Sequence, residues 1–115
     1  MDITEKSFNG CETAYKDALA VIFGAPFESG ATRENGACHA PSAMRGESYR
    51  IETFSPYLRE DLLDLQINDA GDIDISSLDV IAALDAVESF CGRLHDDGKM
   101  PVMIGGEHIT ACGAV

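Results

Sequence analysis

Met103-Ile104-Gly105-Gly106-Glu107-His108 is the stretch of sequence that decides the fold. The apolar residues 100–104 predict a buried strand, and the glycine pair that follows predicts a tight turn. This turn delivers a carboxylate and an imidazole to the C-terminal end of the strand, which is the edge of an open α/β sheet where ligands and catalytic groups collect. A neutral imidazole is among the commonest transition-metal ligands. His108 is therefore the candidate metal ligand.

Upstream, two segments are expected to form the other strands. Residues 18–23 are a continuous apolar run ended by Gly24 and Pro26, which is typical of a strand buried on both faces in a parallel sheet. Residues 62–67 alternate apolar and polar side chains and are the predicted second strand. The acidic residues 69–74 are interpreted as a turn that precedes a helix.

Helices are expected between these strands. Pro41 suits the first turn of a helix that continues through residues 42–51, after a long ordered loop at residues 27–42. Ser76 and Asp79 form an S-x-x-D capping box ahead of a longer helix, which Gly98 ends. The apolar face of that helix has i+3/i+4 spacing and consists of Val80, Leu84, Val87, Cys91 and Leu94.

The order strand, helix, strand, helix, strand defines the expected fold class. It predicts an α/β domain over residues 17–115 with parallel strands joined by right-handed crossovers. Residues 1–16 are polar without a clear period and are expected to form an amino-terminal arm. Three strands make a thin sheet, so its edges would be exposed unless another segment or subunit covers them.

Composition and charge exclude several classes of protein. With 45% hydrophobic and 24% charged residues, the 115-residue chain has the balance of one small globular domain rather than of a disordered segment. The formal net charge of -12 argues against nucleic acid or an anionic membrane as partner, because both are negatively charged and are bound mainly by Lys and Arg. The longest apolar run, residues 18–27, is too short to span a bilayer.

The amino-terminal residues and the cysteines indicate a cytoplasmic protein. Asp2 and Glu5 do not fit the basic-then-apolar pattern of a secretory signal. The cysteines have no C-x-x-C spacing and are expected to be reduced thiols; they are Cys11, Cys38, Cys91 and Cys112.

Several segments, in the right order, resemble the ureohydrolases, the arginase and agmatinase family. Gly105-Gly106-Glu107-His108, followed by Ile109-Thr110, is similar to the family's first metal-binding motif. Phe23-Gly24-Ala25-Pro26-Phe27-Glu28-Ser29-Gly30-Ala31 resembles the agmatinase-type loop after the first strand, and Asp69-Ala70-Gly71-Asp72 matches the D-x-G-D turn. Between them, the spacing of the family's glycine-rich stretch is matched by Gly36, Pro41, Ala43, Met44 and Arg45.

The resemblance implies a three-layer α/β/α fold with a parallel sheet, of which only the amino-terminal strands and helices are present here. It also implies a binuclear Mn2+ site, in which a bridging hydroxide attacks a guanidinium carbon and releases urea and an amine. Guanidinium is poorly electrophilic, so metals that lower the pKa of bound water are needed, and Asp and His ligands suit manganese.

By motif position, His108 would be a ligand of one metal, and Glu107 would support that ligand rather than bind directly. The other ligands belong to an Asp-x-His-x-Asp segment and a later Asp-x-Asp segment, neither of which occurs in these residues. No catalytic residue is therefore assigned. The chain departs from the family at Ile109, where Ser or Thr is usual, and at Ala40, where Gly usually precedes Pro41.

The remaining candidates are interpreted mainly as structural. The acidic cluster lacks the order of an EF-hand, and histidines outside the motif are assigned to a helix end or to the loop. These residues are Asp69, Asp72 and Asp74 in the acidic turn, His95 at the helix end, His39 as a possible lining residue, Cys91 and Cys112 in packing, and Arg33 and Arg45 as hydrogen-bond ties of the loop.

The leading hypothesis is the amino-terminal portion of an agmatinase-like binuclear-metal hydrolase, inactive as this chain alone. Its partners would be a guanidino small molecule and either further copies of the chain or a partner chain. The alternative is a non-catalytic truncated homologue that acts as an interaction module or as one subunit of a split enzyme.

Overall fold

A computed structural model describes residues 7–28 and 36–115 of the chain. The expectations for Gly30 and Arg33 lie outside the described residues. Within the described part, none of the helices is both long enough and apolar enough to cross a membrane.

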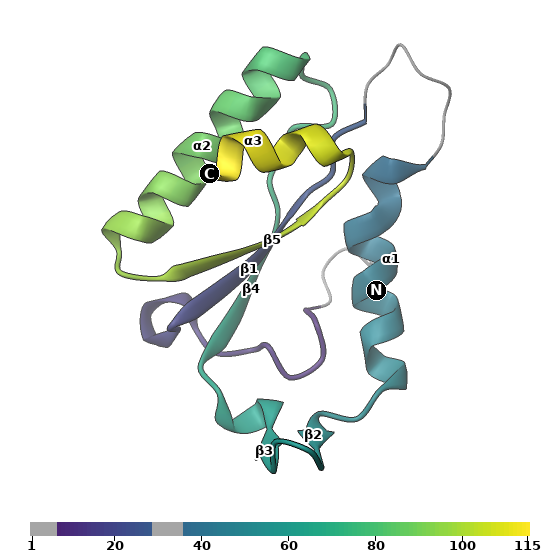
Figure 1. Ribbon diagram of the computed structural model, residues 1–115, viewed down its shortest axis with the longest axis vertical. Helices are drawn as coiled ribbons and strands as arrows, with labels where there is room; N and C mark the ends of the chain where they lie inside the picture. Colours follow the sequence, from purple (N-terminus) through teal and green to yellow (C-terminus); the bar gives the residue numbers. More distant parts are fainter. Residues whose placement is uncertain (1–6, 29–35) are drawn as a thin grey trace.

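A three-stranded parallel sheet in the order β4-β1-β5 is the centre of the fold. Its strands are β1 (Ala20–Ala25), β4 (Ile67–Asp72) and β5 (Met100–Gly105). Helices α2 (Val80–Asp96) and α3 (Ala111–Ala114) lie on one face, and α1 (Ala40–Glu47) lies on the other (Figure 1). This arrangement confirms the predicted parallel α/β fold with helices on both faces.

The main core lies between β1 and α2. Val21, Phe23 and Ala25 alternate along β1 and are fully buried, and the Phe23 ring lies 4.6 Å from the ring of Phe90, measured between centroids. Burying one large apolar side chain stabilises the fold by about 1.5–3 kcal/mol. The predicted first strand is therefore present, although it extends to Ala25 rather than ending at Phe23.

The buried face of α2 agrees in part with the predicted one. Val87, Cys91 and Leu94 are buried as expected, whereas Val80 and Leu84 are only partly buried and Ala83 takes a core position. Ala83 fits because it follows Val80 and precedes Val87 at helical spacing.

The start of α2 differs from the prediction. Asp79, not Ser76, is the N-cap, and its carboxylate accepts a hydrogen bond of 2.8 Å from the Ala82 N–H. The residues before Asp79 form a turn, in which the Leu78 N–H donates to the Ile75 carbonyl, and this turn buries Ile75. The S-x-x-D capping box is therefore wrong.

The end of α2 is as predicted. Gly98 has a φ of 73° and its N–H donates to the His95 carbonyl at 2.9 Å, while the Lys99 N–H reaches the Leu94 carbonyl at 2.8 Å. This left-handed residue closes the last turn, as glycine does at helix C-termini. Strand β5 then begins at Met100, as expected.

The predicted second strand at residues 62–67 is wrong. Leu62–Asp64 is a short 3-10 helix, in which the Asp61 carboxylate accepts from the Leu63 N–H at 2.9 Å. Strand β4 instead covers most of the stretch interpreted as an acidic turn, and it pairs with β1 through Ala20–Ile67 and Ile22–Asp69. The acidic stretch is stable within the sheet because Asp69 forms an ion pair with Arg45 and accepts a hydrogen bond from the Phe8 N–H.

Helix α1 begins as predicted, with Pro41 in its first turn, but ends at Glu47. A 3-10 helix at Ser48–Arg50 follows, and the Ser48 hydroxyl donates to the Arg45 carbonyl at 2.7 Å. A small antiparallel hairpin that the sequence did not predict then joins β2 (Phe54–Ser55) to β3 (Glu60–Asp61).

The described part of the amino-terminal arm lies along the outer edge of β4. The Asp69 N–H donates to the Cys11 carbonyl and the Thr13 N–H donates to the Ile67 carbonyl, both at 3.1 Å. Glu12 forms an isolated antiparallel bridge with Asn68. Residues 7–17 thus cover this edge of the sheet.

Candidate functional site

The glycine turn after β5 is hydrogen-bonded to the end of β1 and to the segment that follows it. The Gly106 N–H donates to the Ala25 carbonyl and the Glu107 N–H donates to the Phe27 carbonyl, both at 2.9 Å. A Cβ on Gly106 would collide with the Phe27 backbone and would lie 3.1 Å from the Ala37 carbonyl oxygen. Only glycine fits this close approach, which fixes the turn at the C-terminal edge of the sheet.

His108 lies directly beyond this turn and is exposed to solvent. It begins a 3-10 helix, His108–Thr110, that leads into α3. The Thr110 hydroxyl donates to the Glu107 carbonyl at 2.9 Å, and its side chain is buried. Thr110 thus forms a hydrogen bond within this turn, while Ile109, where Ser or Thr is usual, is exposed.

Residues 25–28 and 36–39 form the wall beside the turn. The Cys38 N–H donates to the Glu28 carboxylate at 3.3 Å, which joins the described ends of the loop. His39 ends the 3-10 helix Ala37–His39 in this wall. His95, by contrast, lies in the last turn of α2, just before β5 begins, and so at the opposite end of the sheet from His108.

A metal ion bound by protein needs several donor side chains close to one point. Among residues 7–28 and 36–115, no group of three or more His, Cys, Asp or Glu side chains could hold a metal. His108 stands at the predicted place, but the other described residues do not complete a site around it. The described residues by themselves therefore do not fit a binuclear centre.

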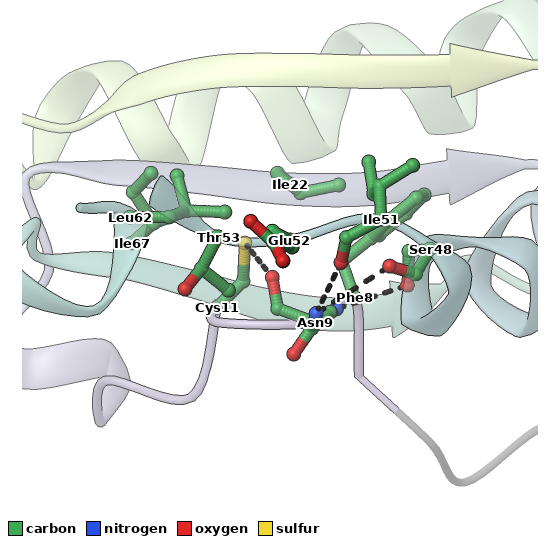
Figure 2. A pocket seen from close by; sticks show the side chains of 10 residues that line it. All are labelled: Phe8, Asn9, Cys11, Ile22, Ser48, Ile51, Glu52, Thr53, Leu62 and Ile67. Atoms are coloured by element: carbon green, nitrogen blue, oxygen red, sulfur yellow. Dashed lines mark hydrogen bonds between the residues drawn. The ribbon is translucent and has the colours of Figure 1, made fainter. Parts of the chain in front are cut away.

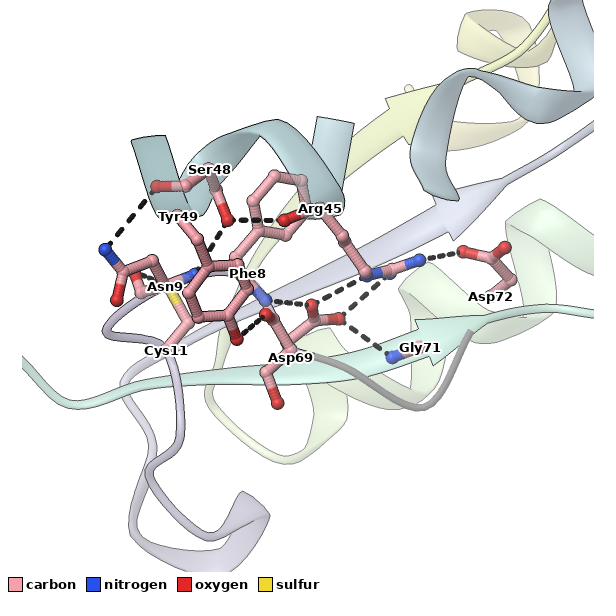
Figure 3. Close-up of polar contacts among 10 residues, drawn as sticks. Phe8, Asn9, Cys11, Arg45, Ser48, Tyr49, Asp69, Gly71 and Asp72 are labelled. Carbon is pink, nitrogen blue, oxygen red and sulfur yellow. Dashed lines mark hydrogen bonds and ion pairs between the residues drawn. The ribbon is translucent and has the colours of Figure 1, made fainter. Parts of the chain in front are cut away.

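The acidic stretch forms a buried ion-pair cluster rather than a cation loop (Figure 3). The Arg45 guanidinium donates to both carboxylate oxygens of Asp69, with Nε–Oδ2 and Nη2–Oδ1 distances of 2.8 and 2.9 Å. Its Nη1 donates to Asp72. Arg45 and Asp69 are 1% and 2% exposed, so their ion pair is shielded from water, whereas Asp72 is 28% exposed. Arg45 ties α1 to β4, and the predicted acidic turn is wrong for Asp69 and Asp72.

Further contacts saturate the Asp69 carboxylate. The Phe8 N–H donates to Oδ2 at 2.8 Å and the Gly71 N–H donates to Oδ1 at 2.9 Å (Figure 3). The Phe8 ring lies 5.5 Å from the Arg45 guanidinium carbon. Burial lowers the pKa of Arg45, but hydrogen bonds and charge from Asp69 and Asp72 outweigh it and raise this pKa above its ordinary value. The cluster therefore holds together the arm, α1 and β4.

Two of the four cysteines, Cys11 and Cys91, are buried. All four are free thiols. Burial raises the pKa of Cys91, and burial together with the charge of Asp69 raises the pKa of Cys11, so both thiols stay protonated and are weak nucleophiles. Cys91 is in the core as expected, whereas Cys112 is exposed and does not have the packing role expected for it.

A cavity of about 190 Å³ lies on the α1 side of the sheet, away from the glycine turn (Figure 2). It is lined mainly by apolar side chains of the arm, β1 and the segment before β4, including Phe8, Cys11, Ile22, Leu62 and Ile67. The rest of the lining includes the polar residues Asn9, Ser48, Glu52 and Thr53, and none of the lining residues belongs to the glycine turn or to His108.

Comparisons with known proteins agree with the fold and the motif. The arginase family matches residues 18–115. The agmatinase of Bacillus subtilis (strain 168) is 33% identical over 106 residues, which cover 92% of this chain and 37% of that protein. The agmatine ureohydrolase of Thermoplasma volcanium superposes with a TM-score of 0.88 at 35% identity, over 95% of this chain and 37% of that one.

A formiminoglutamase variant of Trypanosoma cruzi, solved with Mn2+, superposes with a TM-score of 0.73 at 31% identity, over 88% of this chain and 35% of that one. A parallel sheet with helices on both faces and a glycine turn carrying a histidine define an arginase-like α/β domain. The chain belongs to the arginase family. It spans about 37% of the length of the agmatinases that it matches.

Proposed function

We propose that this chain is the amino-terminal part of an agmatinase-like hydrolase, which cleaves a guanidino compound to urea and an amine. The observation that carries this proposal is the position of His108, directly after a turn whose Gly106 tolerates no side chain. That turn is at the sheet edge where ligands collect in α/β proteins. The similarity to agmatinases supports the substrate class.

In this proposal His108 contributes one imidazole to a manganese site that residues outside this chain complete. The Mn2+ in the Trypanosoma cruzi formiminoglutamase supports the choice of metal. Because the described residues contain no group of three or more side chains that could hold a metal, the chain alone should bind Mn2+ weakly and release no urea from agmatine. Urea release by the purified 115-residue chain would contradict the proposal.

The positive test is complementation. The chain is co-expressed with the carboxyl-terminal remainder of the Bacillus subtilis agmatinase, and urea release from agmatine is measured with added Mn2+. His108→Ala should abolish the activity, because it removes a proposed ligand. His95→Ala is the matched control, since His95 is also exposed but lies at the opposite end of β5, and it should leave the activity unchanged.

The cellular setting belongs to the same proposal. In this proposal the protein is cytoplasmic, with which the free thiols agree. It would work as a homo-oligomer or with a partner chain. The net charge of -12 does not favour nucleic acid or anionic membranes as partners.

The alternative function is a non-catalytic interaction module or one subunit of a split enzyme. The observation that favours it is the outer edge of β5, with which no described segment pairs. Size-exclusion chromatography with light scattering tests the interaction module, because a strict monomer at all concentrations, with no partner recovered, would contradict it.

A further inference from the structure

The two faces of the sheet are packed differently around β1. On the α2 side, Val21 and Phe23 are fully buried. Ile22 points to the opposite face, because successive residues of a strand alternate between faces, and it is only half-buried although β1 is the central strand. Ile67 of β4 is half-buried too. Strands of parallel sheets are normally covered on both faces, so the α1 side of this sheet leaves space over β1 and β4.

That space is the cavity of about 190 Å³ shown in Figure 2. Its walls are the arm, the segment after α1 and Leu62, and Ile22 and Ile67 line it from the sheet. Cys11 is 3% exposed in the inner wall, whereas Ile51 is 69% exposed and marks the side that opens to solvent. The cavity is therefore reached from the surface and extends to the sheet.

Polar groups in the lining are hydrogen-bonded within the chain (Figure 2). The Asn9 side-chain amide donates to the Ser48 and Ile51 carbonyls at 3.4 and 3.2 Å. The Ser48 hydroxyl donates to the Arg45 carbonyl at 2.7 Å and accepts the Asn9 N–H at 3.0 Å. No buried side-chain nitrogen or oxygen of the described residues lacks a partner. A polar ligand would have to displace one of these bonds, whereas an apolar ligand would not.

The walls of the cavity are held apart by contacts of the arm. The Phe8 N–H donates to the buried Asp69 carboxylate at 2.8 Å. Gly10 rests on the opposite wall, because a Cβ there would lie 3.1 Å from Leu62 Cδ2 and 3.3 Å from Thr53 Cγ2. The Leu62 N–H in turn donates to the Thr53 carbonyl at 2.9 Å. The arm therefore cannot move closer to fill the space, and the cavity is preformed.

We propose that this cavity is a binding site for a small, uncharged, apolar molecule of about the size of a benzene ring. Apolar cavities of about 150 Å³ stay dry and bind benzene, and this one is of that size and is lined mainly by apolar side chains. A ligand here contacts the arm and the sheet at once, so its binding stabilises the arm on β4. The site is separate from the glycine turn, so the inference does not depend on the proposed hydrolase function.

The test uses the full 115-residue chain with benzene and benzoate as probes. Benzene at ten times its dissociation constant should raise the ratio of folded to unfolded chain about tenfold, because it binds the folded state only. Benzoate has the same ring with a charged carboxylate, whose burial without a partner is unfavourable. At the same concentration it should leave the ratio unchanged. Urea denaturation measures both effects.

Methyl NMR spectra locate the bound probe. The ring current of benzene should shift the methyl signals of Ile22, Leu62 and Ile67, which line the cavity. Val21 and Val87 are internal controls, because both are fully buried in the core on the other face of the sheet. Their signals should not move. The dependence of the shifts on benzene concentration gives the dissociation constant.

A matched pair of variants tests the space itself. Leu62 and Leu63 are neighbours in the short helix after β3, but only Leu62 lines the cavity, and Leu63 is 64% exposed. Leu62→Trp should weaken benzene binding at least about tenfold, because the larger side chain occupies the space of the probe. Leu63→Trp should leave binding unchanged. The comparison of benzene with benzoate needs no variant, so it decides the proposal even where Leu62→Trp does not fold.

Three results would overturn the proposal: methyl signals of Ile22 and Ile67 that benzene does not shift, equal effects of benzene and benzoate on stability, or equal weakening of benzene binding by both tryptophan variants. Shifts confined to the cavity methyl groups, together with stabilisation by benzene alone, would support it.

Discussion

The guanidinium of Arg45 forms a bidentate ion pair with the carboxylate of Asp69, with both donor–acceptor distances below 3 Å. Arg45 is in α1 and Asp69 is in β4, so the pair joins a helix to a strand 24 residues away in sequence. The same carboxylate accepts the Phe8 N–H from the arm. A single buried contact therefore fixes three segments that local sequence preferences do not bring together.

Replacing Arg45 should destabilise the fold strongly. Arg45→Met removes the partner of two carboxylates, of which Asp69 is 2% exposed, and leaving a buried charge unpaired costs about 3–5 kcal/mol. The exposed pair between Arg50 and Glu47 is the control, and Arg50→Met should change the free energy of unfolding by about 1 kcal/mol or less. Urea denaturation followed by circular dichroism measures both. Similar losses for the two variants would contradict the role of the cluster.

Gly24 makes room for this cluster. A Cβ at Gly24 would collide with the Asp72 carboxylate and would lie 2.8 Å from the Pro41 Cβ. Gly24→Ala should therefore lower the free energy of unfolding by about 1–3 kcal/mol. Gly92→Ala is the matched control: its position in α2 is open, and it should stabilise by about 0.4–1 kcal/mol. Thermal unfolding should shift in opposite directions for the two variants.

Much of the fold follows from local pattern. The apolar runs that became β1 and β5, the stop at Gly98 and the start of α1 at Pro41 are all signals of burial or backbone torsion within a few residues. Such signals depend on nearby residues only, and the structure has these elements close to the expected positions, with β1 shifted by two residues.

The errors have a common physical origin. Residues 62–67 alternate like a strand, yet the strand is β4, whose acidic residues are tolerated because Arg45 neutralises them. That neutralisation depends on a residue far away in sequence. The D-x-G-D segment together with an arginine in the preceding helix was the available signal, and it was interpreted as a loop tie instead. For the metal site, the sequence offers His108 alone as a candidate ligand, and the described residues bring no group of three or more His, Cys, Asp or Glu side chains together that could hold a metal.

The start of α2 offers a test of the corrected cap. Asp79→Ala removes the acceptor of the Ala82 N–H and should cost about 1 kcal/mol of stability. Ser76→Ala should change little, because Ser76 is exposed and is not the cap. Urea denaturation of the two variants decides between them. A larger loss for Ser76→Ala would restore the capping box.

The cysteines should differ in the rate at which a thiol reagent labels them. At pH 8, Cys112 should react first with a thiol reagent because it is exposed, whereas Cys11 and Cys91 should react slowly because burial shields them and raises their pKa. Since those thiols keep their protons in the folded state, their contribution to stability should fall as the pH rises above about 9, where the unfolded thiols ionise. Mass spectrometry of timed samples identifies each site. Labelling of Cys91 at the rate of Cys112 would contradict the described core.

Substitutions at Gly106 and at His108 should have different effects on the free energy of unfolding. Gly106→Ala places a methyl group against the Phe27 backbone, so the hydrogen bond between Glu107 and Phe27 should break and stability should fall by about 1–3 kcal/mol. His108→Ala should change stability by no more than about 0.5 kcal/mol, because the side chain is exposed. Unfolding in urea measures both losses on the same scale. A small loss for His108→Ala beside a large loss for Gly106→Ala would favour the proposed role of His108 in chemistry over a role in folding. A large loss for His108→Ala would instead assign it a structural role.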